Sequence, residues 1–333
     1  MTRLDFSLNT FELSNQGKEV GRALTMPLRV CHPVPVCLKA EATPQVLAAG
    51  PKQAALDAAK ALPFLRGMAG SLVQLLVEGC HVGALPNIGL CTGLEHLALV
   101  LLPQSPGPGV HVPVQLAGLA PCTRLRRLRL GRALLQPAAE QLQVLADMPG
   151  LQELELERCS GGSGGKPLDS VPWAAFPSLR AVSLDSCPLG AQALEGMPRC
   201  TRLRSLLLRD TAVSRALLEP LAGARLRRLG VAHSKTVSAP QPLLTAELLM
   251  TLPDLREVAV ENTENAVADP AGLFSSSGSL QRVSLTECKV RGSSFAAATG
   301  LQVSEQAVQR LHLPAFGPNR QKQRSWVFRY APV

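Results

Sequence analysis

One short pattern of hydrophobic and polar positions recurs along most of the chain. A hydrophobic residue is followed by two variable residues, a second hydrophobic residue, one variable residue and a third hydrophobic residue. The pattern occurs nine times, and its copies begin at Leu72, Leu94, Leu125, Leu151, Leu179, Leu203, Leu226, Leu255 and Leu280. Because the second and third hydrophobic positions alternate with variable ones, each copy predicts a β-strand with one buried face.

The stretches between these predicted strands carry a different periodicity. Residues 137–147 open with a proline and place Leu142 and Leu145 on one helical face, and residues 212–221 and 244–252 are similar. Strand, turn and helix repeated in one direction predict a parallel sheet with helices on its other side. Glycine- and proline-rich residues 103–112 and 160–168 predict loops inserted within repeats.

Cysteines and small polar residues occupy two fixed positions of the repeat. Three residues after the third hydrophobic position stand Cys80, Cys159, Cys187, Cys288, Thr211, Ser234 and Thr263. Three residues before the first leucine stand Cys91, Cys122 and Cys200. Together with the hydrophobic pattern, these positions resemble the leucine-rich repeat, and in particular its cysteine-containing subclass, which is common in ubiquitin-ligase receptors with an F-box. The resemblance implies an α/β leucine-rich-repeat solenoid, or horseshoe, with a parallel sheet on the concave side and helices on the convex side.

The repeat divides the chain into three expected parts. Residues 66–295 hold the nine repeats, and residues 1–65 are expected to form an atypical N-terminal cap without a recognisable F-box. Residues 28–38 of this cap alternate but hold two prolines, which predicts an edge strand or extended segment. Residues 296–333 are a degenerate last repeat or a C-terminal cap with a basic and aromatic tail. Here residues 308–313 fit the pattern once more, while Ser304 is equally suited to begin a helix.

Composition narrows the class of protein. Hydrophobic residues make up 46% of the chain, aromatic residues 3%, and the formal net charge is +9. The core must therefore be mainly aliphatic, and the positive charge favours acidic partners. The N-terminus lacks the basic and apolar pattern of a signal peptide, no apolar run approaches the roughly 20 residues that span a bilayer, and nine cysteines show no dense pairing pattern. We expect an intracellular, cytoplasmic protein, with the cytoskeleton, the ciliary axoneme or the nucleus as further locations.

No arrangement of residues predicts catalysis, a cofactor or a metal ion. The glycine-rich stretch from Ser160 to Lys166 does not match a phosphate-binding loop at two positions. Such a loop needs a glycine where Ser160 stands and a serine or threonine where Pro167 stands. The six histidines are scattered, and Cys31, His32 and Cys37 lack a second ligand pair. We therefore expect a protein that is not an enzyme.

Binding is expected at the variable positions of the strands. Leu76, Val100 and Leu207 are the apolar candidates, and Arg127, Arg129 and Glu155 are the charged ones. The residue after the first leucine is an arginine in five repeats, namely Arg126, Arg180, Arg204, Arg227 and Arg256, which form a predicted basic rim. The spacing also places Arg127 opposite Glu153 and Arg129 opposite Glu155, and it places Arg228, Glu257 and Arg282 in one row of alternating charge. These charges either bind a ligand or neutralise each other.

These features predict a non-catalytic scaffold that binds one or more proteins and does not act at a membrane. The resemblance adds a more specific hypothesis, the substrate-recognition component of a ubiquitin-ligase complex. One alternative is a structural subunit of a large assembly such as a ciliary axoneme. A second alternative is an RNA- or phosphate-binding module that uses the basic rim, for which affinity should fall steeply with salt. The sequence leaves the partner and the oligomeric state open.

Overall fold

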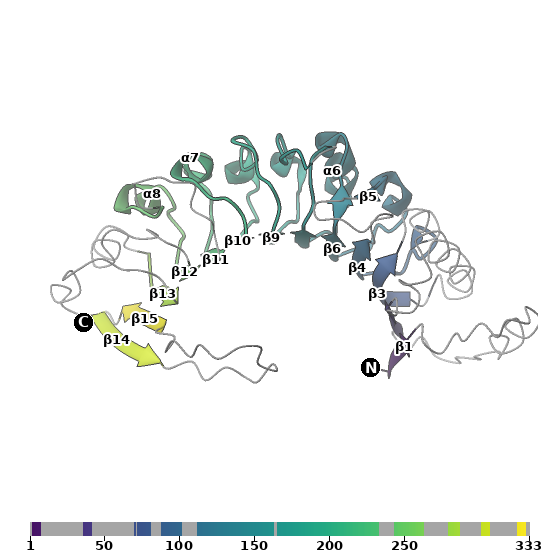
Figure 1. Ribbon diagram of the computed structural model, residues 1–333, viewed down its shortest axis with the longest axis horizontal. Helices are drawn as coiled ribbons and strands as arrows, with labels where there is room; N and C mark the ends of the chain where they lie inside the picture. The colour runs from purple at the N-terminus through teal and green to yellow at the C-terminus, as the bar shows by residue number, and fades with distance from the viewer. Residues whose placement is uncertain are drawn as a thin grey trace, which may run out of the picture. The chain divides into compact units, whose positions relative to one another are not determined.

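The computed structural model describes residues 2–7, 36–41, 70, 72–80, 88–101, 112–162, 165–232, 243–262, 279–286, 301–306 and 325–330. The chain divides into two compact units, Met1–Lys166 and Pro167–Val333. Each unit is described by itself, and the element labels are those of Figure 1.

Unit 1 is built on six parallel strands. They are β1 (Thr2–Ser7), β2 (Val36–Glu41), β3 (Leu72–Cys80), β4 (His96–Leu101), β6 (Arg127–Gly131) and β8 (Glu153–Glu157), and each pairs with the next one named. A second, small sheet joins β5 (Val112–Pro113) to β7 (Ala133–Leu134). The described helices are the 3-10 helix η3 (Leu116–Leu119) and α6 (Ala138–Ala146).

Unit 2 continues the same plan and ends differently. Its parallel strands are β9 (Ala181–Asp185), β10 (Ser205–Arg209), β11 (Arg228–Ala232), β12 (Glu257–Glu261) and β13 (Arg282–Thr286). Strand β15 (Ser325–Tyr330) then pairs antiparallel with both β13 and β14 (Leu301–Gln306). The helices are η4 (Trp173–Ala175), η5 (Met197–Arg199), α7 (Arg215–Leu218), η6 (Glu219–Leu221) and α8 (Ala246–Met250). Figure 1 shows α7 and α8 on the same side of the strands of this unit.

All nine predicted repeat strands are confirmed. In each copy the first leucine is at most 3% exposed, which makes it a buried anchor. From β4 onward the strand begins two residues after this leucine, and from β4 to β12 the second and third hydrophobic residues are buried in the core. Each fully buried leucine contributes about 1.5–3 kcal/mol relative to an exposed one, so the aliphatic repeat itself stabilises the sheet.

The predicted helices are present but shorter than the stretches that predicted them. Pro137 caps α6 and does not lie in its first turn. Ser214 and Thr245 begin α7 and α8, where each hydroxyl accepts a hydrogen bond from the backbone N–H three residues later. In the other described connections a 3-10 helix replaces the α-helix. Amphipathic spacing therefore located the helices, while the cap residues set where they begin.

The ends of the repeat array differ from expectation in two places. Strand β2 overlaps the predicted segment 28–38 but pairs on both sides, so it is not an edge strand; residues 28–35 lie outside the described residues. Ser304 lies inside β14, so the prediction that it begins a helix is wrong. Residues 308–313 and the loop 103–111 also lie outside the described part of the chain. At the second predicted loop, Gly162 and Lys166 form an antiparallel bridge, and residues 163 and 164 lie outside the described residues.

Candidate binding surfaces

The strands of both units have an open face, which we define as the side chains that alternate with the buried ones. In unit 1 these are Gln74, Leu76, His96, Ala98, Val100, Arg127, Arg129, Gly131, Glu153, Glu155 and Glu157. In unit 2 they are Ala181, Ser183, Asp185, Ser205, Leu207, Arg209, Arg228, Gly230, Ala232, Glu257, Ala259, Glu261, Arg282 and Ser284. Residues in register on parallel strands lie about 4.8 Å apart, so these side chains form continuous rows.

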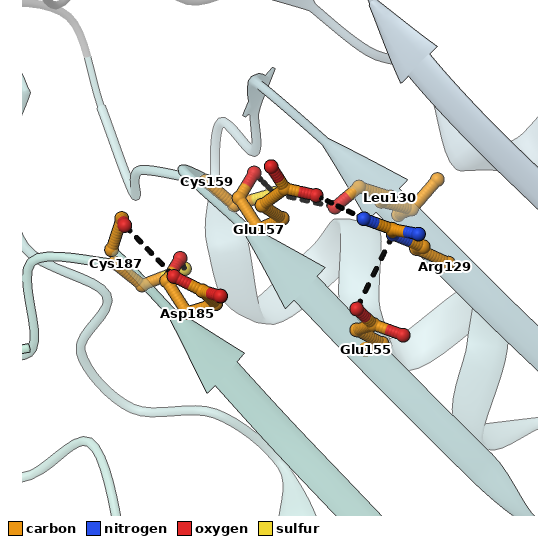
Figure 2. A network of polar contacts seen from close by, with 8 residues as sticks. Arg129, Leu130, Glu155, Glu157, Cys159, Asp185 and Cys187 are labelled. Atoms are coloured by element: carbon orange, nitrogen blue, oxygen red, sulfur yellow. Dashed lines mark hydrogen bonds and ion pairs between the residues drawn. The ribbon is translucent and has the colours of Figure 1, made fainter. Parts of the chain in front are cut away.

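The charged candidates of unit 1 pair with one another. Arg127 lies opposite Glu153, and its Nε is 3.0 Å from a Glu153 carboxylate oxygen. Arg129 lies between two carboxylates, 3.3 Å from Glu155 and 2.6 Å from Glu157 (Figure 2). The guanidinium groups are about half exposed, so each pair is worth at most about 1 kcal/mol. These residues are engaged within the sheet, and three glutamates face two arginines.

The apolar candidates of unit 1 are partly covered by neighbouring strands. Leu76 and Val100 are both of intermediate exposure. Val100 lies opposite Gly131, and its methyl groups come within 3.2 Å of the place where a Cβ on that glycine would stand. Leu76 lies opposite Ala98. The small neighbours leave both side chains accessible from the open face.

An alternating row of charges lies at the start of the unit 2 strands. Arg228 donates a 2.8 Å hydrogen bond to Glu257, whose other oxygen is 3.6 Å from Arg282. The hydrogen bond from Arg228 is the main cause that lowers the pKa of Glu257, while partial burial of the carboxylate opposes the shift. The register predicted from the sequence is therefore present in this row.

Leu207 is the middle residue of β10 and belongs to the unit 2 open face. It is of intermediate exposure, with Ser183 on one side and Gly230 on the other. Its Cδ1 is 2.7 Å from the place where a Cβ on Gly230 would stand, closer than real Cβ contacts allow. The leucine therefore lies over the bare backbone of the next strand, in space that a side chain at position 230 would otherwise share.

The predicted basic rim differs between the units. In unit 1, Arg126 shares Glu95 with Arg124, at 3.7 and 3.0 Å. In unit 2, Arg204 Nη1 donates to the carbonyl oxygens of Thr201, Leu203 and Arg225. The remaining members, Arg180, Arg227 and Arg256, are exposed, and no side-chain partner contacts them within the described part of unit 2. Of the five arginines predicted for the rim, these three thus have guanidinium groups that are uncommitted.

The cysteines of the repeat are buried hydrogen-bond donors. Cys122 donates to the carbonyl oxygens of Ile88 and Cys91, and Cys200 donates to those of Phe176 and Leu179. Burial raises the pKa of Cys122 to about 11, which keeps the thiol protonated.

The second cysteine position is used in the same way. Cys159 donates to the Leu130 carbonyl oxygen, and Cys187 to that of Asp185 (Figure 2). These thiols pack the repeats together. Among the described residues, no three histidine, cysteine or acidic side chains gather closely enough to hold a metal ion.

A turn that the sequence did not predict follows the described strands. The first residue after β6, β8, β9, β10 and β12 has a positive φ, between 43° and 59°; these residues are Arg132, Arg158, Ser186, Asp210 and Asn262. The left-handed conformation directs the next residue, such as Cys159 or Thr211, back into the core. Asn and Asp tolerate this conformation and are a signal for it, whereas the serine and the two arginines are not.

Comparison with known proteins adds little to this description. No family model matches the sequence, and no curated protein matches it. Among solved structures, the chain is similar to an internalin (inlF) from Listeria monocytogenes str. 4b F2365, with 13% identity and a TM-score of 0.30. The match covers 67% of this chain and 76% of the internalin chain. The likeness is weak, so the fold rests on the strand order and register given above.

Among the described residues, no helix is both long enough and apolar enough to cross a lipid bilayer.

Proposed function

We propose that this chain is a non-catalytic scaffold that binds a partner protein, and that the open face of unit 2 is a recognition surface. The observation that carries the proposal is the position of Leu207. It is a large, accessible apolar side chain between a row that holds Arg228 and Glu257 and a row that holds Asp185 and Arg209. An apolar centre with a charged surround is the usual anatomy of a protein interface.

The surroundings of Leu207 support this proposal in two ways. Its row otherwise contains Ser183, Gly230, Ala259 and Ser284, so a partner can approach the sheet closely. Gly230, in register beside it on β11, also has no side chain, so no side chain at that position covers the leucine.

A pair of matched substitutions tests the proposal. The full chain is used as bait, and the proteins it retains are quantified for the wild type, Leu207→Glu and Met250→Glu. Met250 is the control because it is 59% exposed and belongs to α8, away from the open face. We expect Leu207→Glu to release the partner and Met250→Glu to keep it. Loss on Met250→Glu with retention on Leu207→Glu would show that the helical side binds instead.

A narrower role, substrate recognition in a ubiquitin-ligase complex, is a further proposal. It is supported by the two cysteine positions of the repeat, which are typical of the receptor subclass that the sequence resembles. The same purification tests it, because a ligase receptor must retain a ligase adaptor or a cullin. Repeated purification of the full chain without either component would exclude this role. An axonemal role would instead require recovery of structural subunits of the axoneme.

A further inference from the structure

We propose that the basic rim of unit 2 binds an acidic, extended segment of the partner protein. We define this rim as Arg180, Arg202, Arg204, Arg225, Arg227 and Arg256. The inference rests on the proposed function, since it assigns the chemistry of one part of the partner. It concerns the edge of the sheet at which the strands begin, and not the open face around Leu207.

The rim is a double row set by the strand register. Arg180, Arg204, Arg227 and Arg256 each stand one residue before a strand, and Arg202 and Arg225 stand two residues earlier. Backbone hydrogen bonds join neighbouring members of the first row. The Arg204 N–H donates to the Arg180 carbonyl oxygen, the Arg227 N–H to that of Arg204, and the Arg256 N–H to that of Arg227. The row therefore has a fixed spacing of about 4.8 Å per strand.

Positive charge dominates this edge. Asp254 is the only acidic residue at the corresponding positions of β9 to β12, and it forms no ion pair with the rim. Of the six arginines, Arg204 alone makes side-chain hydrogen bonds within the described part of unit 2, and it donates them to three carbonyl oxygens. An anionic ligand therefore meets exposed guanidinium groups that no carboxylate of the described part of unit 2 neutralises.

The dimensions fit a short peptide. From Arg180 to Arg256 the rim crosses three strand spacings, or about 14 Å. An extended peptide covers this length with roughly four or five residues, at about 3.3–3.6 Å per residue. The forked guanidinium group also matches the two oxygens of a carboxylate.

Asp254 favours a peptide over a nucleic acid. A nucleic-acid strand carries a negative charge at every nucleotide, so one of its phosphates would be repelled by this carboxylate. A peptide can place an uncharged residue there and acidic residues elsewhere. The interruption of the rim thus suits a ligand whose charge varies along its length.

Fluorescence anisotropy with the full chain tests the proposal. The probe is a labelled eight-residue peptide in which glutamate alternates with serine, and an eight-nucleotide oligouridylate serves as the competing class of ligand. Arg227→Gln with Arg256→Gln removes two uncommitted rim charges. Arg158→Gln with Arg199→Gln removes two exposed charges elsewhere and is the matched control. Arg204 is left unchanged, because its hydrogen bonds to carbonyl oxygens support the fold.

We expect the rim pair to weaken peptide binding roughly tenfold and the control pair to weaken it less than about twofold. Asp254→Asn should strengthen binding roughly two- to threefold, a gain that misfolding cannot produce. Equal weakening by the two pairs would show attraction by net charge alone and would overturn the proposal. Tighter binding of the oligouridylate than of the peptide, with the same dependence on the rim pair, would also overturn it.

The Leu207→Glu experiment separates this inference from the proposed function. If Leu207→Glu keeps every partner while the peptide results stand, the open face is not a recognition surface but the rim still binds acidic chains. If Leu207→Glu releases the partner and the peptide does not bind, the scaffold role stands and the rim inference fails.

Discussion

Thr211 offers a direct test of why six of the nine repeats have cysteine or threonine three residues after the third hydrophobic position. The side chain is 2% exposed, and its hydroxyl donates to the Arg209 carbonyl oxygen at 2.8 Å. A second carbonyl oxygen, that of Leu184, lies 3.5 Å away. Thr211→Val keeps the volume and removes the donor, so the substitution isolates the hydrogen bond from packing.

The expected magnitude follows from the partners of the Arg209 carbonyl. A buried carbonyl left without a donor costs about 1–3 kcal/mol. The Arg209 carbonyl, however, also accepts the Ser186 N–H at 2.8 Å, so it is not orphaned by the substitution. We therefore expect Thr211→Val to lower the free energy of unfolding by about 1 kcal/mol, the net value of one hydrogen bond. Thr211→Cys should fall between the wild type and Thr211→Val, because a thiol is a weaker donor.

Urea unfolding measures this difference as a shift in the midpoint at an unchanged slope. Thr201→Val is the control, because Thr201 is exposed and its hydroxyl makes no hydrogen bond. We expect that control to stay within about 0.5 kcal/mol of the wild type. A Thr211→Val protein as stable as the wild type would refute the reasoning, and would show that the position requires only a small side chain.

Three further outcomes are expected. Gly93→Ala should destabilise unit 1, because its Cβ would stand 2.9 Å from the backbone oxygen of Gly70, which cannot move aside as a flexible side chain can; thermal unfolding checks this. Glu257→Gln should cost less than about 1 kcal/mol at neutral pH. Arg228 lowers the pKa of Glu257 in the folded state, so the stabilisation by Glu257 is present at pH values above its unfolded-state pKa near 4.5. It is lost as the pH falls through the folded-state pKa. The difference in stability between Glu257→Gln and the wild type should therefore vanish when unfolding is measured in acid. Cys122, with its pKa near 11 against an ordinary 9.0, should be alkylated about a hundredfold more slowly than a free thiol at pH 8, as measured by mass spectrometry.

The sequence predicted the strands well because their signal is local. Each strand needs only an anchor leucine and two alternating hydrophobic residues, and both are visible within six positions. The helices were overestimated because their ends depend on single cap residues such as Ser214 and Thr245. The antiparallel pairing of β15 was not predicted, because it joins residues about 40 positions apart in the chain without a repeated pattern.

The side-chain pairs on the open faces could be predicted only where the register of neighbouring strands determines them. Register placed Arg127 against Glu153 and Arg228 against Glu257, and the structure has both pairs. The diagonal pair of Arg129 with Glu157 depends on side-chain rotamers, which the spacing does not determine. The position of Leu207 over Gly230 was also missed, because the effect of a glycine inside a strand is seen only once the neighbouring side chain is placed.

The rim of unit 2 has a thermodynamic consequence of its own. In unit 1 the position before β4 is Glu95, which lies next to Arg126 on the adjacent strand and pairs with it. In unit 2 the same position is an arginine in consecutive repeats, so like charges such as those of Arg227 and Arg256 face each other about 4.8 Å apart, and this is unfavourable.

Arg227→Gln with Arg256→Gln should therefore make the folded protein slightly more stable at low salt, by a few tenths of a kcal/mol. The gain should disappear near 1 M salt, where the screening length falls to about 3 Å. The same pair of substitutions is expected to weaken acidic-peptide binding, so stability and binding should change in opposite directions. Thermal unfolding at two salt concentrations measures the first change. If the variant is less stable than the wild type at low salt, the arginines are held by favourable contacts within the protein and are not kept for an external anion.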